Sequence, residues 1–373
     1  MRRPRPVGRA LAAAITLLAL LDLGALSAHS GPFAAISAPP GVRAAAADAA
    51  KAVEALRGLK FRQTVPISTL SDDEFDRGLR QVPPRGNATG AIALFIALGL
   101  IDRGADLAAS GRALTTEVTG LYDPSGHRIV LRAGLDLMAL RRTLVHELTH
   151  ALDDQHFGLA RVGNTFVSDE SLTTLRALFE GDAVWVERHG SQAPPDTGAL
   201  ATPPAVPPAL LAYVAYPYEA GYRFVDSLRA RGGTRLLNAA FVHPPTSSAQ
   251  ILDPALYQRS SESVEVHKPQ PDGPVLDRGV FGELFVFLTL RSSIASVPAL
   301  KASKAWQGGR YVVYEKAPQI CIRARLAATT SGAPALVDGF MLWAARHPAA
   351  TVTLNGTELD VANCEAIPTG NSS

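Results

Sequence analysis

The sequence has few cysteines and no extended block of basic residues, and these two absences exclude several classes of protein. Only Cys321 and Cys364 occur among 373 residues, and two thiolates are too few for a cysteine-only metal site. Lys and Arg number 36 against 34 Asp and Glu, and no basic run beyond the first nine residues indicates a nucleic-acid-binding surface. No repeat recurs at a fixed period. What remains is a globular chain, 47% hydrophobic, that is long enough to bury a large core.

The N-terminal segment predicts export. Arginines among the first nine residues precede an apolar run from Ala10 to Leu21, and small residues follow up to Ala28. This order is typical of a secretory signal peptide, so we expect cleavage near Ala28. The run is shorter than the roughly 20 residues of a membrane-spanning helix, and membrane contact is expected only if the segment remains as an uncleaved anchor. We therefore expect a secreted or extracytoplasmic protein of a bacterial cell envelope.

The two cysteines lie close to the C-terminus, in segments with strand-like patterns. Export into an oxidising compartment predicts that Cys321 and Cys364 form one disulfide bond. Two buried free thiols are the alternative.

Helical and strand-like patterns alternate irregularly and predict an α+β protein, with a mainly helical core, a small sheet before its central helix and a C-terminal α/β portion. The predicted divisions are a signal peptide at 1–28, a flexible linker at 29–50, a metal-binding region at 51–192, a Pro-rich loop at 193–208 and a C-terminal α+β portion at 209–367, packed on the same core.

The central helix is predicted by leucines at every fourth position from Leu140 to Leu152. A β-hairpin is expected before it, over 120–132, because turn residues separate two β-prone runs. A second helix is expected over 171–189. Further expected elements are helices at 91–101, 219–231, 280–291 and 333–346, and strands at 311–315, 319–327 and 351–362.

The central helix carries the motif HELTH, which predicts a zinc site. His146 and His150 are four residues apart, so their side chains project from one face of a helix and can share a metal ion. Glu147 is then the expected general base, which takes a proton from the attacking water. A surface helix with two ordinary histidines is the alternative interpretation.

A catalytic zinc needs a third protein ligand and an open position. Glu180 is the predicted ligand, because it lies on the second helix, whose apolar stripe should pack against the first, and because the adjacent Gly181 would permit close helix approach. Asp182 and Glu187 are alternatives on the same helix.

His156 is the main rival, since HELTHALDDQH has the spacing of the three-histidine zinc proteases. Those proteases turn the chain with a glycine after the second histidine, but Asp153 stands there in this sequence. In a helix that continues through Gln155, the side chain of His156 points away from the metal.

Further polar residues could complete the site. Metal-binding histidines usually donate their second N–H to an oxygen, for which Asp153, Asp154 and Asp182 are candidates. For stabilisation of an oxyanion we select Tyr218. The alternatives are Tyr216, Tyr222 and His243.

The strings HELTHALDDQHF and LFEGDA resemble the gluzincin branch of the zincin metallopeptidases. GLYDPSGHRIVL, YPYEAGYRFVDSL and PPTSSAQILDP are similar to segments of a little-characterised group of exported prokaryotic proteins with an HELxHALQDQHF core. The resemblance implies His146 and His150 as ligands, Glu147 as catalytic acid and base, and Glu180 as third ligand. The sequence departs from this group at Asp153, where glutamine is usual, and at Asp253, where histidine often occurs.

The expected function is therefore that of an exported zinc-dependent metallopeptidase with peptide or protein substrates. No nucleic-acid partner is expected. Two alternatives remain open: a catalytically silent zinc-binding envelope domain, and a zinc hydrolase of a non-peptide amide in the cell wall.

Overall fold

Two β-sheets and the helices around them make up the structure. The computed structural model describes residues 37–81, 87–102, 104–159, 169–191, 206–260 and 262–367. Within these ranges one sheet has three strands and the other has five, and the mixture with helices confirms the predicted α+β class. The expected signal segment and most of the expected Pro-rich loop lie outside the described residues. None of the described helices is both long enough and apolar enough to cross a membrane.

The N-terminal helix α2 spans Pro40–Arg57, so the prediction of a flexible linker up to residue 50 is wrong for this stretch. Proline is tolerated in the first turn, where its missing N–H would have no helical partner, and Gly58 ends the helix with a left-handed φ of 64°. Ala46, Ala49 and Val53 are buried on one side of α2. Alanine has high helix propensity but little hydrophobicity, and a stripe composed mostly of alanine is a weak sequence signal.

The smaller sheet precedes the central helix. Strand β1 (Ile67–Leu70) pairs in parallel with β3 (Arg128–Arg132), and β2 (Gly120–Asp123) pairs with β3 in antiparallel orientation. This confirms the predicted hairpin and leaves β2 as an outer strand of the sheet.

The central helix α6 spans Leu137–Phe157. It begins after Asp136, whose side chain accepts a hydrogen bond from a backbone N–H in the first turn. Leu144, Leu148 and Leu152 are all buried, as their spacing predicted. α6 therefore has one face in the core and is continuous through the whole HELTHALDDQHF string.

Helices α8 (Asp169–Gly190) and α9 (Pro208–Val242) cross in close backbone contact at Gly181 and Gly221. A Cβ atom on Gly181 would lie 2.3 Å from backbone atoms of Gly221, which is far too close for any real side chain. Gly181 thus permits close helix approach as predicted, but it brings α8 against α9, whereas α6 was the expected neighbour. The reason is that Gly181 follows Glu180 by one residue and therefore lies about 100° around α8 from the side chain that faces α6.

α9 is longer than the helix predicted over 219–231 because it begins at Pro208 and continues past Pro217. The predicted break at the glycine pair is present as a kink, where Gly233 has φ 61° and ψ −155°.

The larger sheet has the strand order β4-β5-β6-β8-β7. Cys321 on β6 (Gln319–Ala328) lies directly opposite Cys364 on β8 (Glu358–Ala366), and the two residues form the predicted disulfide bond. The remaining strands are β4 (Val275–Val280), β5 (Trp306–Lys316) and β7 (Thr351–Asn355).

Residues 351–362 do not form one strand as predicted. They are divided by a tight turn in which Gly356 has a φ of 65°, so that β7 and β8 pair with each other as a hairpin. The Asn355-Gly356 pair is a typical sequence of such turns.

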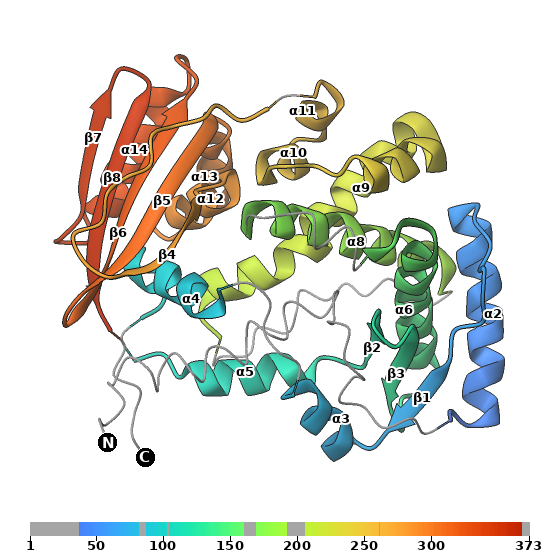
Figure 1. The fold of residues 1–373 in the computed structure, drawn as a ribbon. Helices are drawn as coiled ribbons and strands as arrows, with labels where there is room; N and C mark the ends of the chain where they lie inside the picture. Colours follow the sequence, from blue (N-terminus) through green and yellow to red (C-terminus); the bar gives the residue numbers. More distant parts are fainter. Residues whose placement is uncertain are drawn as a thin grey trace.

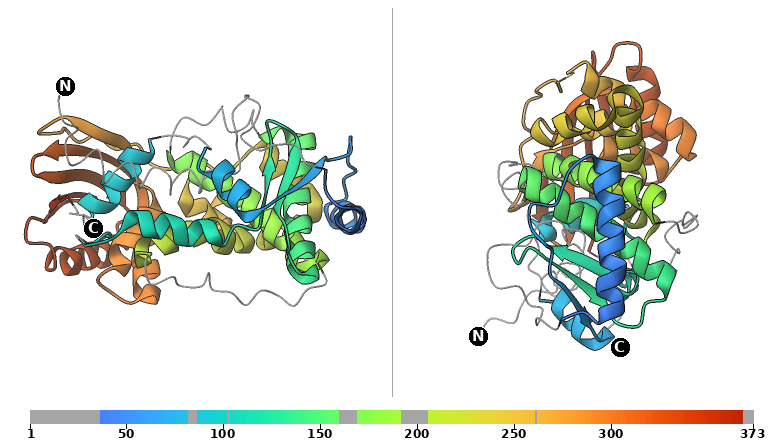
Figure 2. Two further views of the ribbon diagram at one scale, coloured as in Figure 1. Left: turned by 90° about the horizontal axis from the view of Figure 1, so that it is seen from below. Right: turned by 90° about the vertical axis from the view of Figure 1, so that its right-hand side faces the viewer.

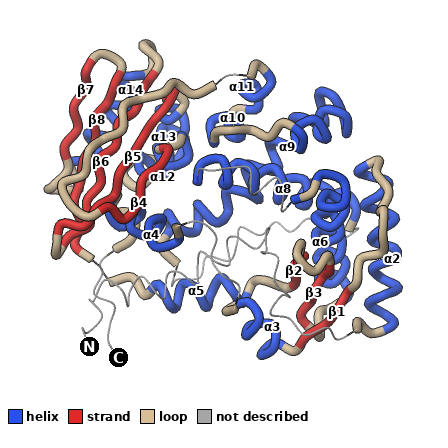
Figure 3. Tube along the Cα trace, viewed as in Figure 1, coloured by secondary structure: helices blue, strands red, loops and turns tan. Residues whose placement is uncertain are grey.

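The remaining helices surround these elements, and their arrangement is shown in Figures 1, 2 and 3. The larger sheet lies at one end of the molecule, the smaller sheet with α6 and α2 lies at the other, and α8 and α9 run between them. The helices not yet named are α3 (Asp72–Leu79), α4 (Ala88–Ala97), α5 (Leu107–Thr116), α10 (Ser248–Leu252), α11 (Pro254–Gln258), α12 (Glu283–Arg291), α13 (Ser296–Ser303) and α14 (Ala333–Ala344).

Candidate metal site

The two motif histidines converge on one carboxylate of the neighbouring helix. His146 Nε2 lies 3.1 Å from Glu180 Oε2, and His150 Nε2 lies 3.5 Å from the same oxygen. The potential ligand atoms of these three residues all lie within 4.8 Å of one another. The structure therefore brings together the residues predicted as ligands, in a group that could hold a metal ion.

The distances from the Glu180 oxygen to the two histidine nitrogens are close to those between the ligands of a tetrahedral metal ion. Nitrogen and oxygen ligands about 2.0–2.2 Å from zinc are roughly 3.3–3.6 Å apart at the corners of a tetrahedron, and the observed nitrogen-to-oxygen distances are 3.1 and 3.5 Å. The three side chains are 10–14% exposed. Two imidazoles and one carboxylate leave one corner of a tetrahedron for water or substrate.

The charges of these groups are strongly coupled. Burial opposes protonation of His146, but the carboxylates of Glu180 and Glu187 outweigh it and raise the pKa of the histidine. The pKa of His150 is also raised, with burial again opposed by Glu180. Burial would raise the pKa of Glu180, yet the two histidines hold it below its usual value. Glu180 is therefore anionic at neutral pH and suited to bind a cation.

Glu147 lies next to this group and is 8% exposed. Burial raises its pKa, and the charges of His146 and His150 offset that effect only in part. The backbone N–H of Tyr122, on the outer strand β2, donates a hydrogen bond to the Glu147 carboxylate. A carboxylate with a raised pKa is a better base near neutral pH.

The second ring nitrogen of His146 also has a carboxylate partner. His146 Nδ1 lies 3.1 Å from Glu187 Oε2. Glu187 is on the same helix as Glu180, about two turns later. This contact orients the ring so that Nε2 faces Glu180. Glu187, an alternative third ligand in the sequence, thus holds a ligand in place and is not itself part of the three-residue group.

The other two alternative ligands point elsewhere. His156 Nε2 contacts the backbone oxygen of Lys60 at 2.8 Å, because α6 continues past the motif and carries this side chain to another face. Asp182 is fully buried and forms ion pairs with Arg57 and Arg229 at 2.7 and 3.2 Å.

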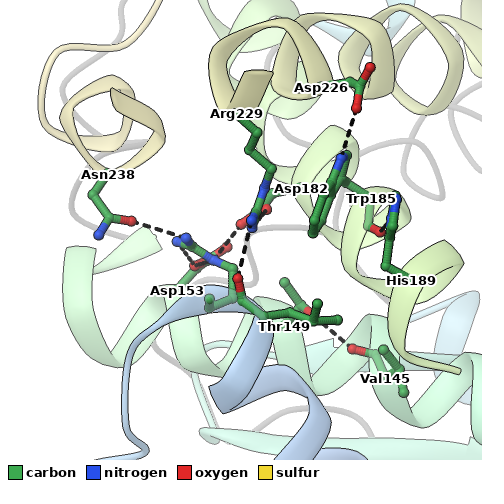
Figure 4. Close-up of polar contacts among 11 residues, drawn as sticks. Val145, Thr149, Asp153, Asp182, Trp185, His189, Asp226, Arg229 and Asn238 are labelled. Carbon is green, nitrogen blue, oxygen red and sulfur yellow. Dashed lines mark hydrogen bonds and ion pairs between the residues drawn. The ribbon is translucent and has the colours of Figure 1, made fainter. Parts of the chain in front are cut away.

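Asp153 and Asp182 face each other across a buried charge cluster at the end of α2 (Figure 4). Arg57 is fully buried; its Nη2 lies 2.7 Å from Asp153 Oδ1, and its Nη1 donates to the side chain of Asn238 on α9. Arg57 Nε directs its hydrogen to Asp153, so its close contact with Asp182 is an ion pair without a hydrogen bond. The cluster joins α2, α6, α8 and α9 directly behind the candidate ligands.

Asp154 belongs neither to the three candidate ligands nor to the Arg57 cluster. Its Oδ2 accepts a hydrogen bond from the Tyr122 hydroxyl at 2.7 Å and lies 3.1 Å from His127 Nδ1. The prediction that Asp153, Asp154 or Asp182 supports a motif histidine is therefore wrong, because each of them is engaged with another side chain.

Tyr218 lies beside the site, as predicted. Its ring stacks on that of His146, with centroids 6.4 Å apart. Burial and the nearby Glu180 raise the pKa of Tyr218, so the phenol remains a hydrogen-bond donor at neutral pH. Among the alternatives, Tyr222 stacks under Arg188, and the hydroxyl of Tyr216 is buried near two other carboxylates.

Two contributors were not predicted from the sequence. Arg57 lies within the predicted metal-binding region at 51–192, but its pairing with Asp153 depends on the packing of α2 against α6, which the sequence pattern does not indicate. The hydrogen bond from Tyr122 to Glu147 is donated by the backbone N–H. It therefore does not depend on the residue type and cannot be predicted from it.

Comparisons of the chain with models of protein families, with curated proteins and with solved structures find no match. The geometry of the site therefore carries the functional conclusion.

Proposed function

We propose that this protein is an exported zinc-dependent hydrolase, and that its reaction is hydrolysis of peptide bonds. The observation that carries the proposal is the convergence of His146, His150 and Glu180, with Glu147 directly beside them. Two nitrogen donors and one oxygen donor suit zinc, which binds imidazole and carboxylate well.

Each side chain has a distinct task in this reaction. Bound zinc would supply a Lewis acid that lowers the pKa of water to about 7 and polarises a carbonyl group. Glu147 takes the proton of the water that attacks the substrate carbonyl and transfers it to the departing amine. Tyr218 donates its hydroxyl hydrogen to the oxygen on which negative charge develops. Glu187 keeps His146 in its binding orientation.

The peptide substrate is proposed from the likeness of HELTHALDDQHF and LFEGDA to the zincin metallopeptidases. The outer strand β2 does not add to this argument, because all four of its residues are buried. The disulfide bond supports export, because such bonds persist in oxidising compartments.

Zinc content, measured on three variants, tests the assignment of roles. Glu180→Ala removes a ligand and should lose bound zinc, together with activity. Glu147→Gln should retain about one zinc per chain while peptide hydrolysis decreases by at least about 10²- to 10⁴-fold, the range typical of a lost general base. His156→Ala is the matched control and should keep its zinc.

Three other results would contradict the proposed ligands or the proposed reaction. Purified protein that takes up no zinc would refute the proposal, and loss of zinc from His156→Ala would favour a three-histidine site. Zinc-loaded protein that cleaves no peptide in a mixed library would restrict the reaction to another amide or to binding alone.

A further inference from the structure

Arg176 lies about one helical turn before Glu180 on α8. Residues four apart on a helix project from the same face, so this arginine is on the side of α8 that presents the candidate metal ligand. Its side chain is partly buried.

The crossing of α8 and α9 brings Arg176 close to Tyr218. A Cβ atom on Gly221 would lie 2.0 Å from the backbone oxygen of Ala177, the residue that follows Arg176. Tyr218 lies three residues before Gly221 on α9 and therefore on the same side of that helix. The positive charge of Arg176 also acts to lower the pKa of the Tyr218 phenol, against the larger effect of burial.

Arg176 has no ion-pair or hydrogen-bond partner among the described residues. Partly buried guanidinium groups are normally paired, because removing their hydration is costly. The carboxylates of the candidate site are engaged, since Glu180 faces the two histidines and Glu187 faces His146. The hydroxyl of Tyr218 likewise has no hydrogen-bond partner among these residues. Two hydrogen-bond donors beside the site thus have no acceptor within the part of the chain that the structure describes.

We infer that Arg176 binds a carboxylate group of the substrate and makes the enzyme selective for anionic peptides. The inference rests on the proposed function, because it places this carboxylate next to the bond that is hydrolysed. A guanidinium group binds a carboxylate through two parallel hydrogen bonds, and Arg176 is positioned as a specificity residue. The carboxylate could be the C-terminus of the peptide or the side chain of Asp or Glu.

Peptide hydroxamates test the inference without requiring turnover, because they bind zinc through the hydroxamate group. One series compares a free C-terminal carboxylate with a carboxamide, and the other compares Asp and Glu with Asn and Gln at each position near the hydroxamate. Dissociation constants are measured with zinc-loaded wild type, Arg176→Met and Arg176→Lys. Arg188→Met is the matched control, since Arg188 is on the same helix but stacks on Tyr222.

Wild type should bind the acidic member of one series about 10- to 100-fold more tightly, as expected for a charge-assisted pair. Arg176→Met should bind both members equally, Arg176→Lys should keep part of the preference, and Arg188→Met should keep all of it. The series that shows the preference identifies the source of the carboxylate.

Equal affinity for acids and amides in both series, or a preference that persists in Arg176→Met, would overturn the inference while leaving the proposed function intact. Failure of wild type to bind zinc would overturn the proposed function, and this inference with it.

Discussion

Replacing Arg57 with methionine should destabilise the protein strongly. The guanidinium is fully buried and contacts Asp153 and Asp182 at 2.7 Å each. Methionine keeps much of the apolar stem but leaves the two carboxylates buried with Arg229 as their remaining cation. Removing one partner of a buried ion pair typically costs about 3–5 kcal/mol, and we expect a loss of that size in the free energy of unfolding at pH 8.

The loss should depend on pH. Burial raises the pKa of Asp153 to about 7, although Arg57 acts to lower it. Because this pKa lies above that of an unfolded aspartate, the contribution of Asp153 to stability is lost as the pH rises from about 4 to about 7. Without Arg57 the pKa should rise further, so the stability of Arg57→Met should decrease more steeply between pH 5 and pH 8 than that of wild type.

Urea denaturation of zinc-saturated protein at pH 5 and pH 8 measures both effects. The double variant Arg57→Met/Asp153→Asn is the control, since the neutral amide removes one of the uncompensated charges and should restore part of the stability at pH 8. A loss below about 1 kcal/mol at pH 8, or one that is equal at the two pH values, would refute the view that Arg57 compensates these carboxylates.

Three further predictions concern other parts of the molecule. Reduction of the Cys321–Cys364 bond, which closes a loop with a sequence separation of 43 residues, should lower the free energy of unfolding by about 2–4 kcal/mol; thiol labelling and urea denaturation check this. Glu187→Gln should weaken zinc binding roughly 10- to 100-fold by loosening a ligand, as measured by competition with a chelator, and unchanged affinity would contradict that role. Gly221→Val should lower the melting temperature because a side chain there meets the backbone of α8, whereas a fully stable variant would show that the two helices can separate freely.

The sequence patterns were most informative where side-chain spacing alone determines structure. The leucine repeat predicted α6 and its buried face, and the spacing of His146 and His150 predicted their convergence. Glu180 could be selected because a second apolar stripe placed it on a neighbouring helix. α2 was missed because its buried stripe is mostly alanine, and the β7–β8 hairpin was missed although Asn355-Gly356 is a strong turn signal.

The partners of the site were harder to predict because they depend on how distant segments meet. Asp153 and Asp182 are close in sequence to the ligands, yet they pair with Arg57, which is 96 residues before Asp153. Glu187 is close to His146 only because α6 and α8 pack together. The spacing of residues within one helix does not show which charged side chain of a neighbouring helix will contact them.

The glycine contact between α8 and α9 limits how the protein can change during evolution. Where side chains separate two helices, substitutions can change the helix spacing in small steps, and alternative rotamers can absorb local strain. Gly181 and Gly221 meet backbone to backbone, so neither adjustment is available there. The separation between the helix that carries Glu180 and the helix that carries Tyr218 is therefore fixed by backbone contact. Under the proposed function, a change in substrate preference would come from the side chains around this contact, with Arg176 among them.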